Sequence, residues 1–175
     1  MTRCVLLLRA VNVGGTGRVP MAELRSVLAA HTDLTGVDTY IQSGNVVFSA
    51  PARALKTIAA RIEQAVEERA GFRRSAIVRT AAELEAIVAG SPLAARPGLD
   101  PAKIAVVFLA SEPPPVAWAK ALALPAAPDA VHPSGREVFL YFPNGFGQAR
   151  IPMPAFERAL GVAATSRNWT TVAKL

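Results

Sequence analysis

The chain has 175 residues, a length that suits one domain or two small subdomains and allows a sizeable core. Hydrophobic residues make up 51%, but 34 of the 175 are alanine, so this fraction overstates the bulk available for packing. The formal net charge is +6, and each half carries +3 without a basic tail or run. The charge favours an anionic partner. Its even spread weakens the case for a nucleic-acid-binding module, which stays as an alternative to a small-molecule site.

The only cysteine, Cys4, excludes an internal disulfide, as is typical of a protein from a reducing compartment. One cysteine and two distant histidines give no zinc-ligand spacing, so we expect no metal site, and no cofactor motif is present. The apolar run after Arg3 is too short for a signal peptide, and no stretch approaches a membrane span. We therefore expect a cytoplasmic protein that does not contact membranes; the sequence leaves its oligomeric state open.

Residues 1–80 predict six elements in the order β-α-β-β-α-β. These are strand Cys4 to Val11, helix Pro20 to His31, strands Val37 to Gln42 and Val46 to Ser49, helix Arg53 to Ala70, and strand Ser75 to Arg79. Ser43-Gly44-Asn45 forms the hairpin bend, and Gly71 ends the second helix. This order is that of the split βαβ, or ferredoxin-like, arrangement.

Residues 81–102 are predicted to form a helix and then a proline-rich connection. The helix is expected to start at the capping box that Thr80 and Glu83 form. Residues 103–175 then echo the first half less regularly. The predicted elements are strand Lys103 to Leu109, helix Val116 to Leu122, strands near Ala130 to His132 and from Glu137 to Phe142, helix Pro154 to Leu160, and a last helix from Trp169. The sequence thus predicts an α+β fold of two ferredoxin-like subdomains packed together, with mainly antiparallel sheets and helices on one face.

A glycine-rich segment, Gly14-Gly15-Thr16-Gly17-Arg18, follows the first strand and precedes the first helix. It lacks the ending of a P-loop and the spacing of a dinucleotide-binding motif. Backbone N–H groups at a helix N-terminus can hold an anion, with help from Arg18 and the helix dipole. The alternative is a loop whose N–H groups are satisfied by water or by Thr16.

Arg9 and Asn12 are unexpected in or just after an apolar strand. Arg9 either reaches the same ligand as the glycine-rich segment or forms an ion pair with an acid such as Glu23. Gln42 and Asn45 flank the hairpin bend, where they serve either the turn itself or ligand binding.

Arg167 stands just before the last helix, where a cation is unfavourable unless an anion or carboxylate lies nearby. It therefore contacts either a ligand or an internal acid. Next to it, Asn168 has the chemistry of a helix N-cap and Trp169 that of a core residue.

No catalytic signature is present, so the catalytic residues are unknown. An enzyme acting on a small anionic metabolite remains an alternative, and its candidate acids or bases are His132, Tyr40 and Glu23.

The same segments resemble an uncharacterised bacterial family, domain of unknown function 1697. The resemblance lies in Leu7 to Gly15, Arg18 to Arg25, Tyr40 to Phe48, Tyr141 to Gly147 and Thr165 to Val172, which span nearly the whole chain. It implies a fold of two ferredoxin-like subdomains, and it implies no activity.

The leading interpretation is a cytoplasmic protein that binds a phosphate-bearing or otherwise anionic ligand, such as a small molecule or a nucleotide, in a cleft between the subdomains. Arginines would supply charge-assisted hydrogen bonds and glycine N–H groups would supply direction. The predicted contacts are Arg9, Asn12, Gly14, Gly15, Arg18, Gln42, Asn45 and Arg167.

Overall fold

The computed structural model describes residues 1–9, 20–31, 33–40 and 44–175. The chain divides into two compact units, Met1–Glu85 together with Leu175 (unit 1) and Ala86–Lys174 (unit 2). Each unit has its own four-stranded antiparallel sheet, so the predicted α+β fold with two sheet-bearing subdomains is confirmed.

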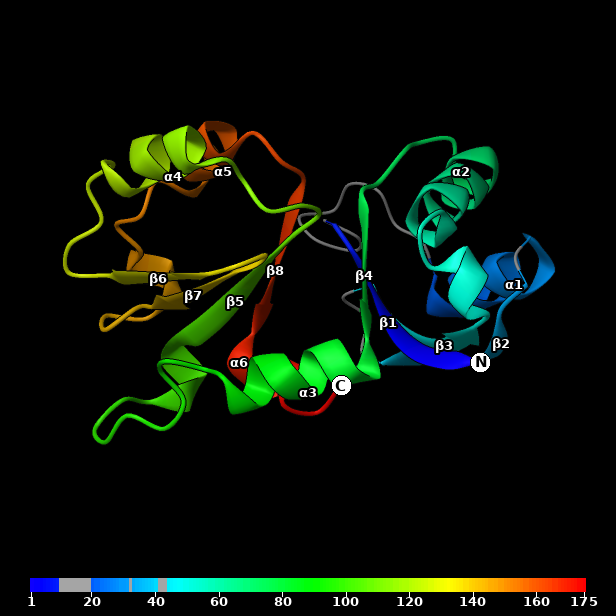
Figure 1. Cartoon of the computed structure of the whole chain (residues 1–175), viewed down its shortest axis with the longest axis horizontal. Helices are drawn as coiled ribbons and strands as arrows, with labels where there is room; N and C mark the ends of the chain where they lie inside the picture. Colours follow the sequence, from blue (N-terminus) through cyan, green and yellow to red (C-terminus); the bar gives the residue numbers. More distant parts are fainter. Residues whose placement is uncertain (10–19, 32, 41–43) are drawn as a thin grey trace. The chain divides into compact units, whose positions relative to one another are not determined.

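Unit 1 has the predicted β-α-β-β-α-β order. Its elements are β1 (Thr2–Leu8), α1 (Met21–His31), β2 (Thr35–Tyr40), β3 (Asn45–Ala50), the short 3-10 helix η1 (Ala52–Ala54), α2 (Ile58–Ala70) and β4 (Ala76–Thr80). The strands form sheet 1 in the order β2-β3-β1-β4, with every neighbouring pair antiparallel. Both helices lie on one face of this sheet (Figure 1). Order and connectivity are those of a split βαβ unit.

The core of unit 1 lies between sheet 1 and its two helices. Alternate residues of β1, including Leu6 and Leu8, point into this core, where they meet Phe48 of β3 and Ile62 of α2. All four of these side chains are almost completely buried. Val5 and Leu7 face the side of the sheet without α1 and α2 and are buried as well, so Cys4 to Leu8 form a continuous apolar run.

Most predicted boundaries in unit 1 are confirmed within a few residues. Helix α2 begins at Ile58, after η1, and ends before Gly71, whose φ of 74° permits the left-handed cap that a side chain would disfavour. The predicted ends of the first two strands extend into residues 10, 11, 41 and 42, which lie outside the described residues.

The predicted capping box is confirmed at the start of α3 (Ala81–Ala89). The Thr80 N–H donates to Glu83 Oε2 at 2.7 Å, and the Glu83 N–H donates to Thr80 Oγ1 at 3.2 Å. These reciprocal bonds satisfy backbone donors that the helix itself leaves unpaired. The cap therefore fixes where β4 ends and α3 begins.

Replacing Thr80 with alanine is expected to lower the free energy of unfolding by about 1–2 kcal/mol, because the Glu83 N–H loses its acceptor. Urea denaturation followed by circular dichroism measures this loss. The matched control is Thr2→Ala, since Thr2 accepts a hydrogen bond from Cys4 Sγ through its backbone carbonyl, which the substitution retains. Equal stability of the two variants would contradict a capping role for Thr80.

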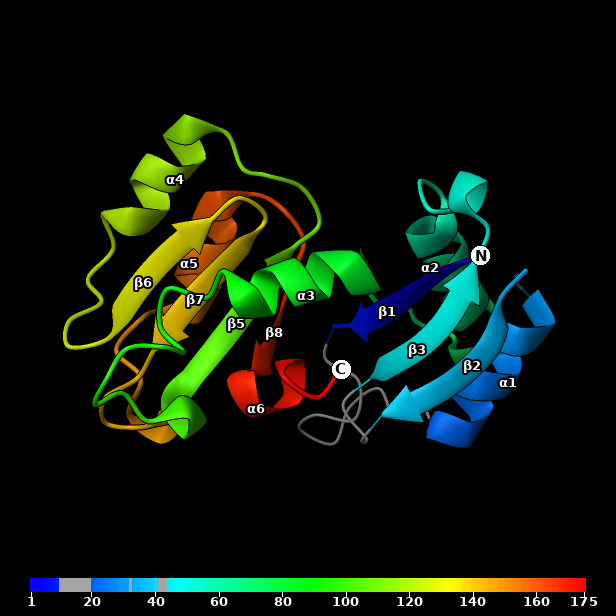
Figure 2. The ribbon, with the colours of Figure 1, turned by 60° about the horizontal axis from the view of Figure 1, so that its bottom comes forward.

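Unit 2 repeats the arrangement of unit 1. Its elements are the 3-10 helix η2 (Pro101–Lys103), β5 (Ile104–Leu109), α4 (Pro115–Leu122), β6 (Ala130–Ser134), β7 (Glu137–Tyr141), the 3-10 helix η3 (Phe146–Gln148), α5 (Met153–Leu160), β8 (Ala164–Asn168) and α6 (Trp169–Val172). The strands form sheet 2 in the order β6-β7-β5-β8 (Figure 2). Helices α4 and α5 pack on one face of it, around Phe156 and Leu160.

Strand β8 is absent from the sequence-based prediction, and its presence completes the second sheet. Its residues, Ala-Thr-Ser-Arg-Asn, contain no apolar run that would mark a strand. They are held instead by pairing with β5, which is buried along its full length. The second half is therefore as regular as the first, contrary to the sequence-based interpretation.

The pairing of the central strand with its two neighbours has the same register in both units. In unit 1, Val5 pairs with Val47 on one side and with Arg79 on the other. In unit 2, Val106 pairs with Phe139 and with Arg167. An arginine thus occupies the same register position of the last strand in both sheets.

The hydrogen bonds beyond the ends of the central strands match as well. Leu8 N–H donates to Gly44 O at 2.9 Å, as Leu109 N–H donates to Arg136 O at 2.8 Å. The following residues repeat the pattern, since Arg9 N–H donates to Ser75 O at 3.0 Å and Ala110 N–H to Ala163 O at 2.9 Å. This alignment gives each residue near the end of β1 a defined counterpart in unit 2.

Candidate functional site

Three of the eight predicted ligand contacts fall on described residues, namely Arg9, Asn45 and Arg167. The other five lie outside the described residues: Asn12, Gly14, Gly15, Arg18 and Gln42. Arg9 and Asn45 belong to unit 1, whereas Arg167 belongs to unit 2. The geometry of the site is therefore built first from unit 1.

Arg9 and Asn45 meet at one end of sheet 1, which we name the Leu8 end after the last residue of β1. At this end Asn45 begins β3 and pairs with Leu7, while Ser75, just before β4, accepts the Arg9 N–H. The glycine-rich segment begins five residues after Arg9 in the sequence. The fold thus brings the start of β3, the start of β4 and Arg9 to the same end of the sheet.

Asn45 serves the hairpin. Its side chain is fully buried, and Nδ2 donates to the Tyr40 carbonyl at 3.2 Å. This bond ties the last residue of β2 to the first residue of β3 across the bend. The structure therefore shows Asn45 in the turn role that the sequence analysis set beside ligand binding.

Arg74 is a cation at the Leu8 end that the sequence analysis did not select. It stands two residues before β4, and its Cζ lies 4.7 Å from the centroid of the Phe72 ring. A guanidinium over an aromatic face is attracted to it and loses freedom of movement. The Nε atom of Arg74 is buried and has no hydrogen-bond partner among the described residues. Arg74 is thus held against Phe72, with one donor that no described residue accepts.

Ion pairs neutralise other arginines of unit 1. The four closest pairs are Arg25–Asp38 at 2.9 Å, Arg61–Asp33 at 3.3 Å, Arg69–Glu23 at 2.9 Å and Arg73–Glu63 at 3.0 Å. Glu23, the acid suggested as a partner of Arg9, is bonded to Arg69. Glu63 also accepts the N–H of Ala76 at 2.9 Å, so it binds both the loop before β4 and β4 itself.

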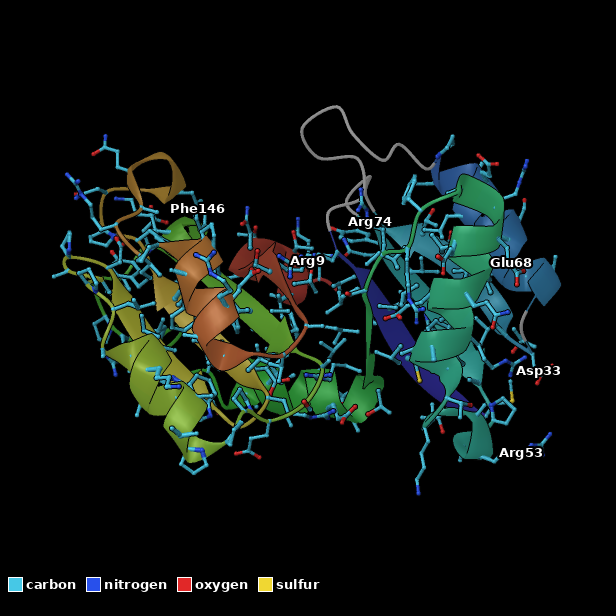
Figure 3. The ribbon with its side chains drawn as sticks, turned by 90° about the horizontal axis from the view of Figure 1, so that it is seen from above. Arg9, Asp33, Arg53, Glu68, Arg74 and Phe146 are labelled. Atoms are coloured by element: carbon cyan, nitrogen blue, oxygen red, sulfur yellow. The ribbon has the colours of Figure 1, made fainter. Side chains whose placement is uncertain are left out.

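At the Leu8 end, Arg74 differs from these paired arginines. Arg74 forms no salt bridge with any described residue. Residues 10–19, which follow Arg9 in the sequence, contain no acid and include Arg18. Figure 3 shows Arg9 and Arg74 at this end of unit 1, whereas Arg53 lies at the opposite end. Arginine side chains supply forked donors that suit carboxylate and phosphate oxygens, so this end can attract an anion.

Arg167 lies in β8, and its side chain is only 8% exposed. Its Nη1 donates to Thr165 Oγ1 and to the Ser166 carbonyl, both at 2.8 Å. Burial lowers the pKa of Arg167 to about 10, so the side chain stays charged at neutral pH. These two hydrogen bonds within β8 help to hold the Arg167 side chain in place without an anion.

Two further predictions at the start of α6 have different outcomes. Asn168 occupies the predicted N-cap position of α6, but its side chain makes no capping hydrogen bond with a described residue. Trp169 is 8% exposed and contacts Phe139, with ring centroids 6.5 Å apart, which confirms its place in the core.

The candidate acids and bases of the enzyme hypothesis are distributed over both units. Glu23 forms its salt bridge with Arg69, and Tyr40 ends β2. His132 lies in β6 of unit 2, where burial and then the nearby positive charge of Arg96 lower its pKa. Among the described residues, no three His, Cys, Asp or Glu side chains are grouped to hold a metal ion. None of the helices in the described parts of the chain could span a membrane.

The architecture defines an α+β protein with two matched split βαβ units and an arginine-bearing sheet end in unit 1. Residues 1–139 match the family model "Protein of unknown function (DUF1697)", and the chain belongs to this family. Among solved structures, it is similar to a conserved bacterial protein from Streptococcus pneumoniae, with 25% sequence identity and a TM-score of 0.74. That likeness covers 99% of this chain and 96% of the other. No curated protein matches the sequence.

Proposed function

We propose that the protein binds a phosphate-bearing or otherwise anionic small molecule at the Leu8 end of sheet 1. The observation that carries this proposal is the buried Nε donor of Arg74, which has no acceptor among the described residues. An unpaired buried donor is costly, and an anionic oxygen placed against it would form a charge-assisted hydrogen bond. Binding would thus use a donor that the described residues leave without an acceptor.

The electrostatics of unit 1 support this location. Acids neutralise Arg25, Arg61, Arg69 and Arg73. At the Leu8 end, by contrast, Arg74 forms no ion pair with a described residue, and the segment that follows Arg9 in the sequence has a positive charge and no acid. An approaching anion would therefore meet a local positive potential at this end of the sheet.

Unit 2 supplies an internal comparison. Its backbone repeats the hydrogen bonds of the Leu8 end, but the counterparts of Arg9 and Arg74 are Ala110 and Val162. Val162 packs against the apolar core of unit 2. The two arginines are therefore not required by the strand pairing, which favours a role in binding for the charges of unit 1.

The proposal is tested by titrating the whole protein with inorganic phosphate, pyrophosphate and ATP in a calorimeter. We expect at least one of these anions to bind, and Arg74→Gln to weaken binding about ten- to a hundredfold through loss of a charged hydrogen bond. Arg9→Gln is expected to weaken binding as well. Binding should also fall as salt concentration rises, because ions screen charges at the protein surface.

Arg53→Gln is the matched control, since it removes the same charge from an exposed position at the opposite end of the sheet. It should leave the affinity within about twofold of wild type, because exposed charges are strongly screened. Equal effects of the Arg53 and Arg74 substitutions would reduce the finding to general charge attraction. Absence of binding by all three anions would overturn the proposal.

A further inference from the structure

The loop between β7 and α5 (residues 142–152, the β7–α5 loop) presents an aromatic side chain to solvent. Phe146 begins η3 and is 39% exposed (Figure 3), whereas Phe142 at the start of the loop is buried. The two ring centroids lie 5.0 Å apart and the ring planes are tilted by 55°, so Phe142 supports one side of the Phe146 ring. The remainder of that ring is open to a ligand that approaches from solvent.

The 3-10 helix of this loop differs from its counterpart in unit 1. Helix η1 occupies the same place, between β3 and α2, and its Ala54 belongs to the core of unit 1. The connection that contains η1 is shorter, residues 51–57, and has no aromatic residue. Helix η3, by contrast, contains no buried residue. The fold therefore places Phe146 where closing the core does not require it.

Hydrogen bonds hold the backbone of the β7–α5 loop at both ends. Near its start, Lys103 Nζ donates to the Pro143 carbonyl at 2.8 Å. Near its end, Oδ2 of the buried Asp129 accepts the N–H groups of Arg150 and Ile151. Backbone hydrogen bonds of 2.8–3.3 Å close the turns between these points. Because the loop is already ordered, binding is opposed by a smaller loss of entropy than for a flexible segment.

The polar side chains on either side of Phe146 are available to a ligand. Asn144, Gln148 and Arg150 are exposed, and none of their side chains forms a hydrogen bond or an ion pair with a described residue. The loop contains no acid. Amide groups bind the edges of nucleobases, a guanidinium binds phosphate oxygens, and an aromatic ring stacks on a base. The loop thus offers the three kinds of contact by which proteins bind unpaired nucleotides.

We propose that the β7–α5 loop binds single-stranded nucleic acid, with an unpaired base stacked on Phe146 and a neighbouring phosphate bound by Arg150. Stacking of one base contributes about 1–3 kcal/mol, which alone gives only weak binding. A strand brings further phosphates, which the formal net charge of +6 attracts whatever the base sequence. A single strand is therefore favoured over a free mononucleotide. This site shares no residue with the anion site proposed in unit 1.

The test compares two labelled DNA strands of ten nucleotides, one of thymidine and one that is abasic throughout. The two strands carry the same phosphates, so they differ only in the bases that are able to stack. Fluorescence anisotropy measures their binding to the whole protein at constant ionic strength. We expect the thymidine strand to bind about fivefold or more tightly than the abasic strand, as one stacked base requires.

Substitutions in the loop separate stacking from charge. Phe146→Ala should weaken binding of the thymidine strand about five- to a hundredfold and leave the abasic strand within about twofold of wild type. Phe146→Trp retains a stacking surface and should preserve the affinity. Arg150→Gln should weaken both strands and reduce the slope of log affinity against log salt concentration by about 0.7, the value for one phosphate contact on a single strand.

Val116→Ala and Lys120→Gln are the matched controls, because they remove an apolar and a charged side chain from exposed positions of α4. Each should change the affinity by less than about twofold, since charges at exposed positions are screened. Circular dichroism checks the folding of every variant. Phe146→Ala should leave phosphate binding unchanged, and its effect on the thymidine strand should persist in Arg74→Gln. The two proposed sites are thus tested separately.

Four results would overturn the proposal. They are an absence of binding by the thymidine strand, equal affinities of the thymidine and abasic strands, an unchanged affinity in Phe146→Ala, and effects of the α4 controls as large as those of the loop variants.

Discussion

Truncation of Phe48 to alanine is expected to lower the free energy of unfolding by about 3–5 kcal/mol, a large loss for a single substitution. Phe48 lies in β3, is 1% exposed, and packs in the core between sheet 1 and its two helices. Alanine removes the whole ring and leaves a cavity whose walls belong to paired strands and cannot collapse easily. Urea denaturation followed by circular dichroism measures the loss.

Phe146→Ala provides the comparison for Phe48→Ala. Phe146 is 39% exposed and meets Phe142 with ring centroids 5.0 Å apart, so its removal costs mainly one aromatic contact, about 0.5–1.5 kcal/mol. The ratio of the two losses tests whether burial in the helix-covered core decides stability. A loss below about 1 kcal/mol for Phe48→Ala would mean that the core of unit 1 is not packed as described.

Truncation of Arg79 to alanine is expected to cost about 2–5 kcal/mol, although the residue is charged and stands in a five-residue strand. Its side chain is 1% exposed and heads the fully buried side chains by size, and Nη1 donates to the Val78 carbonyl at 3.1 Å. Alanine removes the packed hydrocarbon stem as well as the donor. Arg79→Met keeps most of the volume, so it should cost less than Arg79→Ala in the same urea experiment.

The register match extends this expectation to Arg167, which occupies the same position in sheet 2. Arg167→Ala should also be more destabilising than Arg167→Met. Arg3→Ala, at an exposed position of β1, is the control and should change stability by no more than about 0.5 kcal/mol. If the alanine and methionine variants of Arg79 lose equal stability, packing of the stem is not what the residue contributes.

Local sequence signals are sufficient to predict much of unit 1. An apolar run predicts β1, Gly71 predicts the end of α2, and the pair Thr80 and Glu83 predicts the start of α3. Each of these signals lies within a few residues of the feature that it determines, so the sequence contains it directly.

Features that depend on pairing between distant segments cannot be predicted in the same way. Strand β8 has polar residues and is held by β5, about sixty residues earlier in the chain. Burial of Arg79 likewise follows from its position in the sheet, since a charged residue at the end of a predicted strand would be expected to reach solvent. The fold, and not local composition, decides both outcomes.

The candidate site likewise contains one residue that the sequence predicts and one that only the structure shows. Arg9 stands out in the sequence because a cation is out of place at the end of an apolar strand, and the structure finds it at the Leu8 end. Arg74 does not stand out, because it lies in a basic pair before a short strand, where solvent exposure is the ordinary expectation. Only the geometry shows that Arg73 is bonded to Glu63 while Arg74 stacks on Phe72.

The matched register of the two sheets has a practical consequence for protein engineering. The two units show which side chains the same backbone arrangement accepts. Ala110 and Val162 therefore indicate neutral replacements for Arg9 and Arg74 that the Leu8 end should tolerate. Transplanting the residues of one half into the other would give chimaeras whose backbones are already compatible. Such exchanges can separate the side chains that folding requires from those that serve another role in each unit.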